Sequence, residues 1–138
     1  MIVQVPPEQD HLDQARHNEA LLDHFLTAVL PSHSEFADWA LVVTFYAALH
    51  YTKAAIIRDH GEFAPHHITR FDPGGIRHPG HNDLVREHLP VLRSLYGDLF
   101  DLSQEARYRG YYRKPGDLVA EVKRQRVRLY DIKAACGY

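Results

Sequence analysis

The longest apolar run in this chain is ADWALVVTFYAALHYTKAAII, residues 37–57, and it decides the fold. Its part from Trp39 to Thr52 has 14 residues without a formal charge, and apolar or aromatic side chains fall on every side of a helix drawn through it. A helix that is apolar all round belongs in the centre of a packed bundle or in a membrane. Because roughly 18–20 apolar residues are needed to span a bilayer, the run predicts the central helix of a soluble helical domain, with no membrane association.

Helical periodicity continues on both sides of this run. Upstream, apolar residues recur in steps of three and four until Pro31 ends the pattern, and downstream Gly61 is a good stop for the central helix. No strand pattern, repeat or low-complexity segment stands out. The helices predicted in this way begin at Glu8, Ala37, Asn82, Pro90 and Asp117. The sequence therefore predicts an all-α fold, an up-and-down bundle of four to five helices.

The length of 138 residues fits one domain with its own hydrophobic core. Residues 1–7 end in two prolines and predict an extended tail, and residues 8–138 predict a single helical domain. A long connection at 62–81 is rich in proline, glycine and histidine. A loop of about 20 residues inside a compact domain is usually functional or mobile, so we expect chemistry or disorder there.

The first residues and the cysteine content predict the cellular compartment of the protein. The start, MIVQVPPEQD, has neither the basic patch nor the apolar core of a signal peptide. The lone Cys136 has no second cysteine for an internal disulfide. Both features predict a cytoplasmic, reduced protein.

Charge is distributed unevenly around a net value of −2. Residues 107–138 contain nine Lys or Arg and three acids, whereas the preceding part contains seven bases and fifteen acids. One interpretation is an anionic ligand, an acidic partner protein or a second subunit for the basic segment. The other interpretation is a basic helix that docks on acidic neighbours of the same chain.

No segment matches a phosphate loop, a zinc ribbon, a dinucleotide fingerprint or a nucleophile elbow, so no cofactor is predicted. The long loop instead concentrates histidines, which serve in acid–base chemistry and as metal ligands. The four in or at the end of this loop are His66, His67, His78 and His81. They lack a fixed helical spacing and have no cysteine beside them, so a metal-binding bundle that uses them with His50 stays an alternative.

The remaining candidates are polar side chains in apolar or helical surroundings. His50 stands alone on the apolar central helix, either as a hydrogen-bonded core histidine or as a polar group that faces a cleft. Arg107 follows an apolar helical stripe, and a covered guanidinium usually needs a carboxylate or a phosphate. Tyr108, Arg109 and Tyr112 mix aromatic and basic side chains, as in nucleic-acid surfaces or at a packed helix end.

Three segments together resemble the HEPN-domain family (higher eukaryotes and prokaryotes nucleotide-binding). They are FYAALHYTKAAII (45–57), the loop that ends in His81-Asn82 with Val85 one turn on, and LYGDLFDLSQEARY (95–108). The resemblance implies a four- or five-helix up-and-down bundle that often dimerises, with a polar groove near the dimer axis. It also implies a setting in bacterial stress, toxin–antitoxin or defence systems, with an antitoxin or a nucleotidyltransferase as partner protein.

Many members of that family are metal-independent ribonucleases that use an arginine followed four to six residues later by a histidine. In that chemistry the histidine acts as general acid or base and the arginine stabilises charge on the phosphate. Here Arg107 is followed by tyrosines and by no histidine. We therefore expect a non-catalytic member that binds a nucleotide, RNA or a partner protein, with an endoribonuclease that uses a degenerate Arg/His site as the alternative.

The expected site follows from this resemblance and from the residue types. We expect Arg107, Tyr108, Arg109 and Tyr112 to contact the nucleotide or RNA, and His50 and His81 to face the same groove. In the endoribonuclease alternative, His50 or His81 supplies the acid–base group and Arg107 holds the phosphate.

Overall fold

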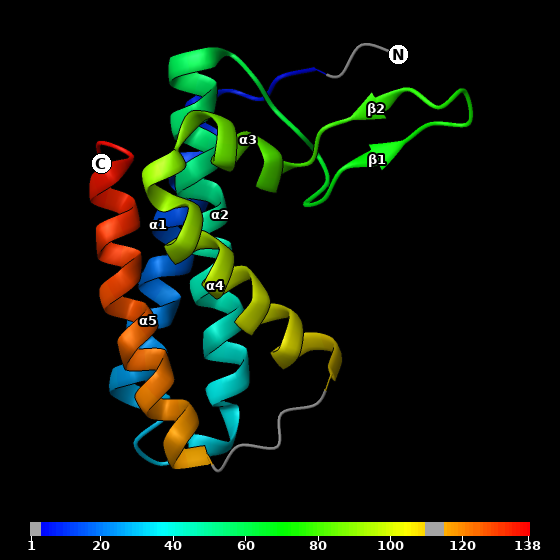
Figure 1. Cartoon of the computed structure of the whole chain (residues 1–138). Helices are drawn as coiled ribbons and strands as arrows, with labels where there is room; N and C mark the ends of the chain where they lie inside the picture. Colours follow the sequence, from blue (N-terminus) through cyan, green and yellow to red (C-terminus); the bar gives the residue numbers. More distant parts are fainter. Residues whose placement is uncertain (1–3, 110–114) are drawn as a thin grey trace.

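The computed structural model of the chain describes residues 4–109 and 115–138. Four helices run alternately down and up, and a short fifth helix lies near the upper end of the bundle (Figure 1). The helices are α1 (Glu8–His24), α2 (Ala37–His60), α3 (His81–His88), α4 (Arg93–Gln104) and α5 (Pro115–Ala135). The predicted all-α up-and-down bundle is confirmed.

Short helical turns extend or connect these helices. They are the π-helical turns η1 (Phe25–Val29) and η4 (Glu105–Arg109), and the 3-10 turns η2 (Ser34–Phe36) and η3 (Pro90–Leu92). Pro90 is the first residue of η3, where its missing N–H costs no helical hydrogen bond. The predicted helix at 90–109 is therefore a 3-10 start, a regular α-helix and a π-helical end.

Helix α2 is the central element, as its composition predicts, with 15 of its 24 residues buried. The segment Ser34–His60 is long and apolar enough to cross a membrane by length and composition alone. However, 72% of its most apolar window is buried inside the bundle. Most of its apolar surface is therefore covered by the rest of the bundle, which is consistent with a soluble protein.

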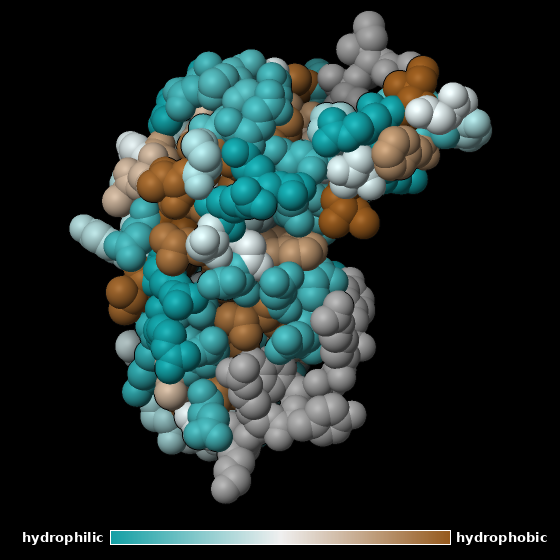
Figure 2. All heavy atoms as spheres, viewed as in Figure 1, coloured by the Kyte–Doolittle hydropathy of each residue, from teal (hydrophilic) through white to brown (hydrophobic). Residues whose placement is uncertain are grey.

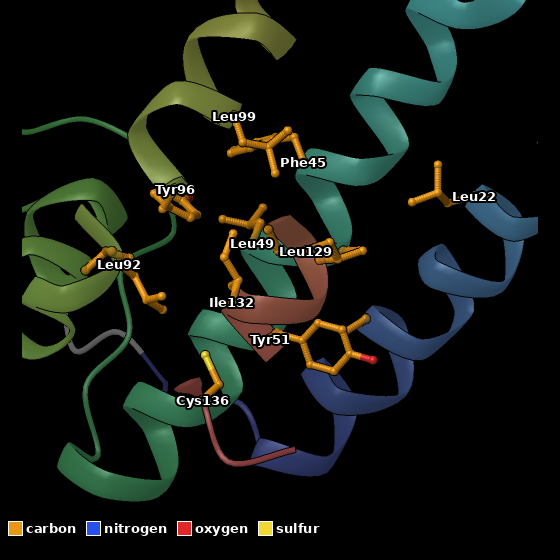
Figure 3. Close-up of a cluster of buried hydrophobic side chains, with 14 of the residues drawn as sticks. Leu22, Phe45, Leu49, Tyr51, Leu92, Tyr96, Leu99, Leu129, Ile132 and Cys136 are labelled. Carbon is orange, nitrogen blue, oxygen red and sulfur yellow. The ribbon is translucent and has the colours of Figure 1, made fainter. Parts of the chain in front are cut away.

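The core gathers around α2 with side chains from the long helices. Leu22 of α1, Phe45 and Tyr51 of α2, Leu99 of α4 and Leu129 of α5 are all completely buried (Figure 3). One contiguous cluster contains all of them. Burial of a Leu or Phe side chain contributes about 1.5–3 kcal/mol, so this cluster holds the long helices together.

The long loop contains a hairpin that the sequence analysis did not predict. Strand β1 (Arg70–Phe71) pairs antiparallel with β2 (Arg77–His78), and Figure 1 shows the hairpin projecting away from the helices. The carboxylate of Asp72 accepts hydrogen bonds from the backbone N–H groups of Gly74 and Ile76, both at 2.9 Å. Asp-Pro-Gly-Gly is a good turn sequence, but strands of two residues are too short to show an alternating pattern.

The basic helix α5 docks on acidic residues of α1. Arg126 donates to Asp23 (Nε to Oδ1, 2.8 Å) and to Glu19 (Nη2 to Oε2, 3.1 Å). Lys133 lies 3.4 Å from Glu19 (Nζ to Oε1), and the hydroxyl of Tyr51 donates to the same carboxylate oxygen at 2.7 Å. Of the two interpretations of the uneven charge, docking within the chain is therefore the one observed for these bases.

Candidate functional site

Residues 66–68 of the long loop lie directly against the start of α3. The backbone N–H of His81 donates to the carbonyl of His66 at 2.7 Å, and that of Asn82 donates to the carbonyl of His67 at 2.9 Å. A Cβ atom on Gly80 would lie 2.3–2.6 Å from backbone atoms of His67 and Ile68. Only glycine allows this approach, so the position of the loop histidines depends on Gly80.

Asp83 fixes the same loop from the first turn of α3. Its carboxylate accepts hydrogen bonds from the backbone N–H of Gly80 at 2.8 Å and from the hydroxyl of Thr69. Arg86 donates to the other oxygen at 2.6 Å. These bonds hold the pKa of Asp83 below its usual value, against the opposing effect of burial. The loop is thus tied to α3 by both backbone and side chain.

A groove of about 420 Å³ lies between this loop and the end of α4. The loop contributes one wall and the last turns of α4 and η4 contribute the other. The lining residues are His66, His67, Ile68, Arg70, Phe100, Gln104 and Arg107. In Figure 2 the outline of the molecule is indented below the projecting hairpin, on the side where these two elements approach each other.

The polar lining of this groove is basic. Arg70 and Arg107 each carry a positive charge, His66 and His67 add imidazoles, and none of the described lining residues is an acid. Arg70 contacts the imidazole of His66 (Nη1 to Nε2, 2.5 Å). Because a guanidinium only donates, the Nε2 atom of His66 accepts this bond. Such a groove attracts anions, and arginine in particular matches phosphate oxygens.

Arg107 is oriented by the central helix. Its Nη1 donates to the hydroxyl of Tyr46 at 2.8 Å, and the guanidinium lies 5.5 Å from the centre of the Tyr46 ring. The residue belongs to η4, the π-helical turn that ends the helix begun by α4. The widened turn and the Tyr46 contact together place this arginine at the groove.

A second pocket, of about 310 Å³, adjoins the basic groove. The two share His66, Ile68 and Arg70. The remainder of the second pocket is mostly apolar and lies along the hairpin. Its other lining residues are Pro65, Phe71, Asp72, Pro73, His78 and Pro79. The site therefore combines a basic part and a largely apolar, partly aromatic part.

Histidines and a lysine form a partly buried polar layer next to the groove. The Nδ1 atoms of His11 and His50 lie 2.8 Å apart, and Nε2 of His81 lies 2.8 Å from the Thr52 hydroxyl. Burial is the main cause that lowers the pKa of each of these histidines, to about 4 for His50, and the nearby Lys53 lowers all three further. These imidazoles are therefore neutral at pH 7.

His67 belongs to the groove and is coupled to this layer. Its ring lies 5.6 Å from the ring of Phe45 and 5.9 Å from that of Phe100, centre to centre. Burial lowers its pKa most, followed by the positive charges of Lys53 and Arg107. A bound phosphate would bring negative charge to this place and would favour the protonated imidazole.

The predicted site residues are thus separated by the structure. Arg107 lines the groove, whereas His50 and His81 are absent from its described lining, and His81 is only 1% exposed. His81 is buried because it packs at the start of α3 against Thr52 of the central helix. The side chains of Tyr108 and Arg109, like the whole of Tyr112, lie outside the described part of the chain.

The loop histidines predicted as metal ligands occupy different places. His66 and His67 line the basic groove, His78 pairs with Asp72 on the hairpin at 3.1 Å, and His81 is buried. Among the described residues, the group whose side chains converge closely enough for a metal ion does not contain any of these four.

Sequence reasoning missed three residues that shape this site: Tyr46, His67 as a groove residue and Arg70. Tyr46 and Arg107 are 61 positions apart in the sequence, so no local pattern connects them. For Arg70, the sequence offers only one weak indication of a role in the site: it follows His66 by four residues in a loop with many turn residues.

Comparisons with known proteins add no relative. No family model, curated protein or solved structure matches the chain. The resemblance to HEPN domains stays a prediction, and function has to be argued from the groove itself.

Proposed function

We propose that this chain binds RNA or a nucleotide in the groove between the long loop and the end of α4. The basic groove takes the phosphates and the adjoining apolar pocket takes a base. The observation that carries the proposal is that the basic groove and the apolar pocket adjoin each other and share the lining residues His66, Ile68 and Arg70.

Two fixed charges support the phosphate part. Arg70 comes from the hairpin and Arg107 from η4, so a phosphate between them would be contacted from both walls. Charge-assisted bonds between arginine and phosphate are among the stronger hydrogen bonds in proteins. The neutral His67 beside them offers a further hydrogen-bonding group and can take up a proton when the anion arrives.

Exposed apolar side chains support the base part. Phe71 is 68% exposed and Ile68 is 62% exposed, and both line the apolar pocket. Figure 2 shows brown, hydrophobic atoms on and below the projecting hairpin. Aromatic side chains beside a positively charged groove are typical of proteins that bind single strands, where each stacked base contributes about 1–3 kcal/mol.

The biological setting is part of the same proposal and rests on the family resemblance. In this setting the chain is a cytoplasmic, dimeric HEPN-like module of a bacterial stress, toxin–antitoxin or defence system. Its partner protein would be an antitoxin or a nucleotidyltransferase, and it would act by binding without cleavage.

Fluorescence anisotropy with a labelled single-stranded RNA tests the binding. We expect affinity to fall with salt, and Arg70→Ala and Arg107→Ala each to weaken binding and to reduce the salt slope by about one. The control is Arg16→Ala, an exposed arginine of α1 that does not line either pocket. Equal binding by all three variants would remove this groove as the RNA site.

A metal-independent endoribonuclease is the second candidate, and one observation favours it. His67 and Arg107 line the same groove and interact electrostatically. The acid–base group would then be His67, in place of the expected His50 or His81, with Arg107 on the phosphate. Cleavage of RNA in the presence of a chelator, lost in His67→Ala and in Arg107→Ala but kept in His50→Ala, is the expected result. If the folded wild-type protein leaves the RNA intact, the endoribonuclease candidate is removed and binding without cleavage is the remaining function.

A further inference from the structure

Three potential metal ligands converge where α2 and α3 end, and a further histidine, His60, stacks beside them. His60 is the last residue of α2, Glu62 follows Gly61, and Glu87 and His88 close α3. One ligand atom from each of Glu62, Glu87 and His88 lies within 4.8 Å of the others. In the part of the chain that the structure describes, this is the one His and carboxylate cluster with such convergence.

Backbone and ring packing bring these side chains together. Gly61 adopts the left-handed conformation (φ 64°) that turns the chain away from α2 and presents Glu62. The Nε2 atom of His88 lies 2.9 Å from the Glu62 carboxylate, and its ring stacks on that of His60 with centres 3.8 Å apart. The side chain of His88 is only 11% exposed. The imidazole is thus held in place, while the two carboxylates remain open to solvent.

The local electrostatics favour a cation. Glu62 and Glu87 are both acids, and the carboxyl ends of two helices, α2 and α3, lie at this place. Each helix end carries partial negative charge from its last carbonyl groups. An ion that binds here would offset the repulsion between the two carboxylates.

The donor types indicate which cations fit. Imidazole suits zinc and the neighbouring transition metals, whereas calcium and magnesium prefer oxygen ligands alone. With metal–ligand bonds of about 2.1 Å, ligand atoms in a tetrahedral site lie about 3.4 Å apart. The present spacing of up to 4.8 Å is close enough for side-chain rotation to close the site.

We propose that Glu62, Glu87 and His88 bind a divalent transition-metal ion such as zinc, with the His60 imidazole available as a fourth ligand. The ion replaces the hydrogen bond between His88 and Glu62 and ties the end of α2 to the end of α3. It stabilises the frame from which the long loop departs. This site is separate from the proposed RNA groove and does not depend on it.

Isothermal titration calorimetry of metal-free protein without a histidine tag tests the site, with zinc chloride as the probe. We expect one zinc per chain and a higher melting temperature in zinc. Glu87→Gln should weaken binding at least about tenfold, because even outer-sphere partners of metal ligands contribute 10–100-fold. Glu87 is exposed, so the nearly isosteric amide leaves the fold intact without zinc.

A matched control is His78→Ala, which removes a histidine paired with Asp72 on the hairpin at 3.1 Å. This pair has no third converging ligand among the described residues, so zinc binding should stay at the wild-type level. Visible absorption of bound cobalt, changed in His88→Ala and unchanged in His78→Ala, would identify the ligand directly. No zinc uptake by the wild type, or equal loss in Glu87→Gln and His78→Ala, would overturn the proposal.

Discussion

Replacement of the buried His81 by glutamine should make the free energy of unfolding less dependent on pH, because it removes one group that takes up a proton on unfolding. His81 is 1% exposed, its Nε2 lies 2.8 Å from the Thr52 hydroxyl, and burial lowers its pKa well below the usual 6.5. The hydroxyl of Thr52 donates to backbone carbonyls of its own helix, at 3.0 Å for Ala48. Its oxygen therefore accepts from Nε2–H of a neutral imidazole, and the glutamine amide can donate in its place.

The sign and size of the effect follow from proton uptake on unfolding. A histidine whose pKa is lowered in the folded chain is protonated only after unfolding once the pH falls below about 6.5. Its contribution to stability is complete above that value and is lost as the pH falls toward the folded pKa. For a fully buried group, the free energy of unfolding falls by about 1.4 kcal/mol between pH 7.5 and 5.5.

Urea denaturation followed by circular dichroism at both pH values measures this quantity. We expect the decrease in the unfolding free energy between pH 7.5 and 5.5 to be about 1.4 kcal/mol smaller in His81→Gln than in the wild type. The exposed His17→Gln on α1 is the control and should keep the wild-type decrease. The comparison uses a difference between two pH values, so a general loss of stability in the variant does not affect it.

One result would refute this reasoning. If His81→Gln and the wild type lose the same free energy between the two pH values, His81 is charged or equally accessible in the folded chain. His81 would then be a titrating side chain beside Thr52 and not a neutral, buried hydrogen-bond donor. The residual pH dependence of the variant should come from the other histidines with lowered pKa values, His11, His50 and His67.

Further predictions concern the loop, the ion-pair network and the core. Gly80→Ala should lower the free energy of unfolding by about 1–3 kcal/mol, because the added methyl group would overlap with backbone atoms. Gly97→Ala places its methyl group in open space on α4 and should raise the free energy of unfolding by about 0.5–1 kcal/mol. Equal melting temperatures for the two variants would contradict both expectations. Glu19→Ala should lower the free energy of unfolding by about 1–3 kcal/mol, because it leaves the Tyr51 hydroxyl unpaired. A double-mutant cycle with Tyr51→Phe should show an interaction energy between the two side chains. Leu129→Ala should cost about 2–5 kcal/mol in urea denaturation, and a loss below 1 kcal/mol would contradict its place in the core.

Most of the helical architecture could be predicted because its signals are local. The apolar run of α2 requires burial on all sides, and Gly61 ends that helix in the left-handed conformation that glycine favours. Pro90 divides α3 from α4 because proline lacks the N–H that a helix interior needs. The hairpin was missed because its stability comes from the Asp72 turn and not from a strand pattern.

The candidate site was only partly predictable. Arg107 stood out as a guanidinium on an apolar stripe, and it lines the groove. His50 stood out as a lone histidine on the apolar central helix, and His81 as a loop histidine of the family resemblance. A polar residue on an apolar helix face can find a partner on a neighbouring helix, as His50 does with His11. A sequence pattern shows that such a polar side chain needs a hydrogen-bonding or charged partner, but it does not show which residue or ligand is that partner.

The sequence by itself determined the number and order of the helices, the central place of α2 and the residue types available for binding. These properties depend on side chains three or four positions apart, which one helix brings to one face. Only the tertiary structure decided that Arg70 and Arg107 line one groove, that bases of α5 pair with acids of α1, and that Glu62 contacts His88. Each of these arrangements joins residues 26 or more positions apart, and their distances depend on how whole helices pack.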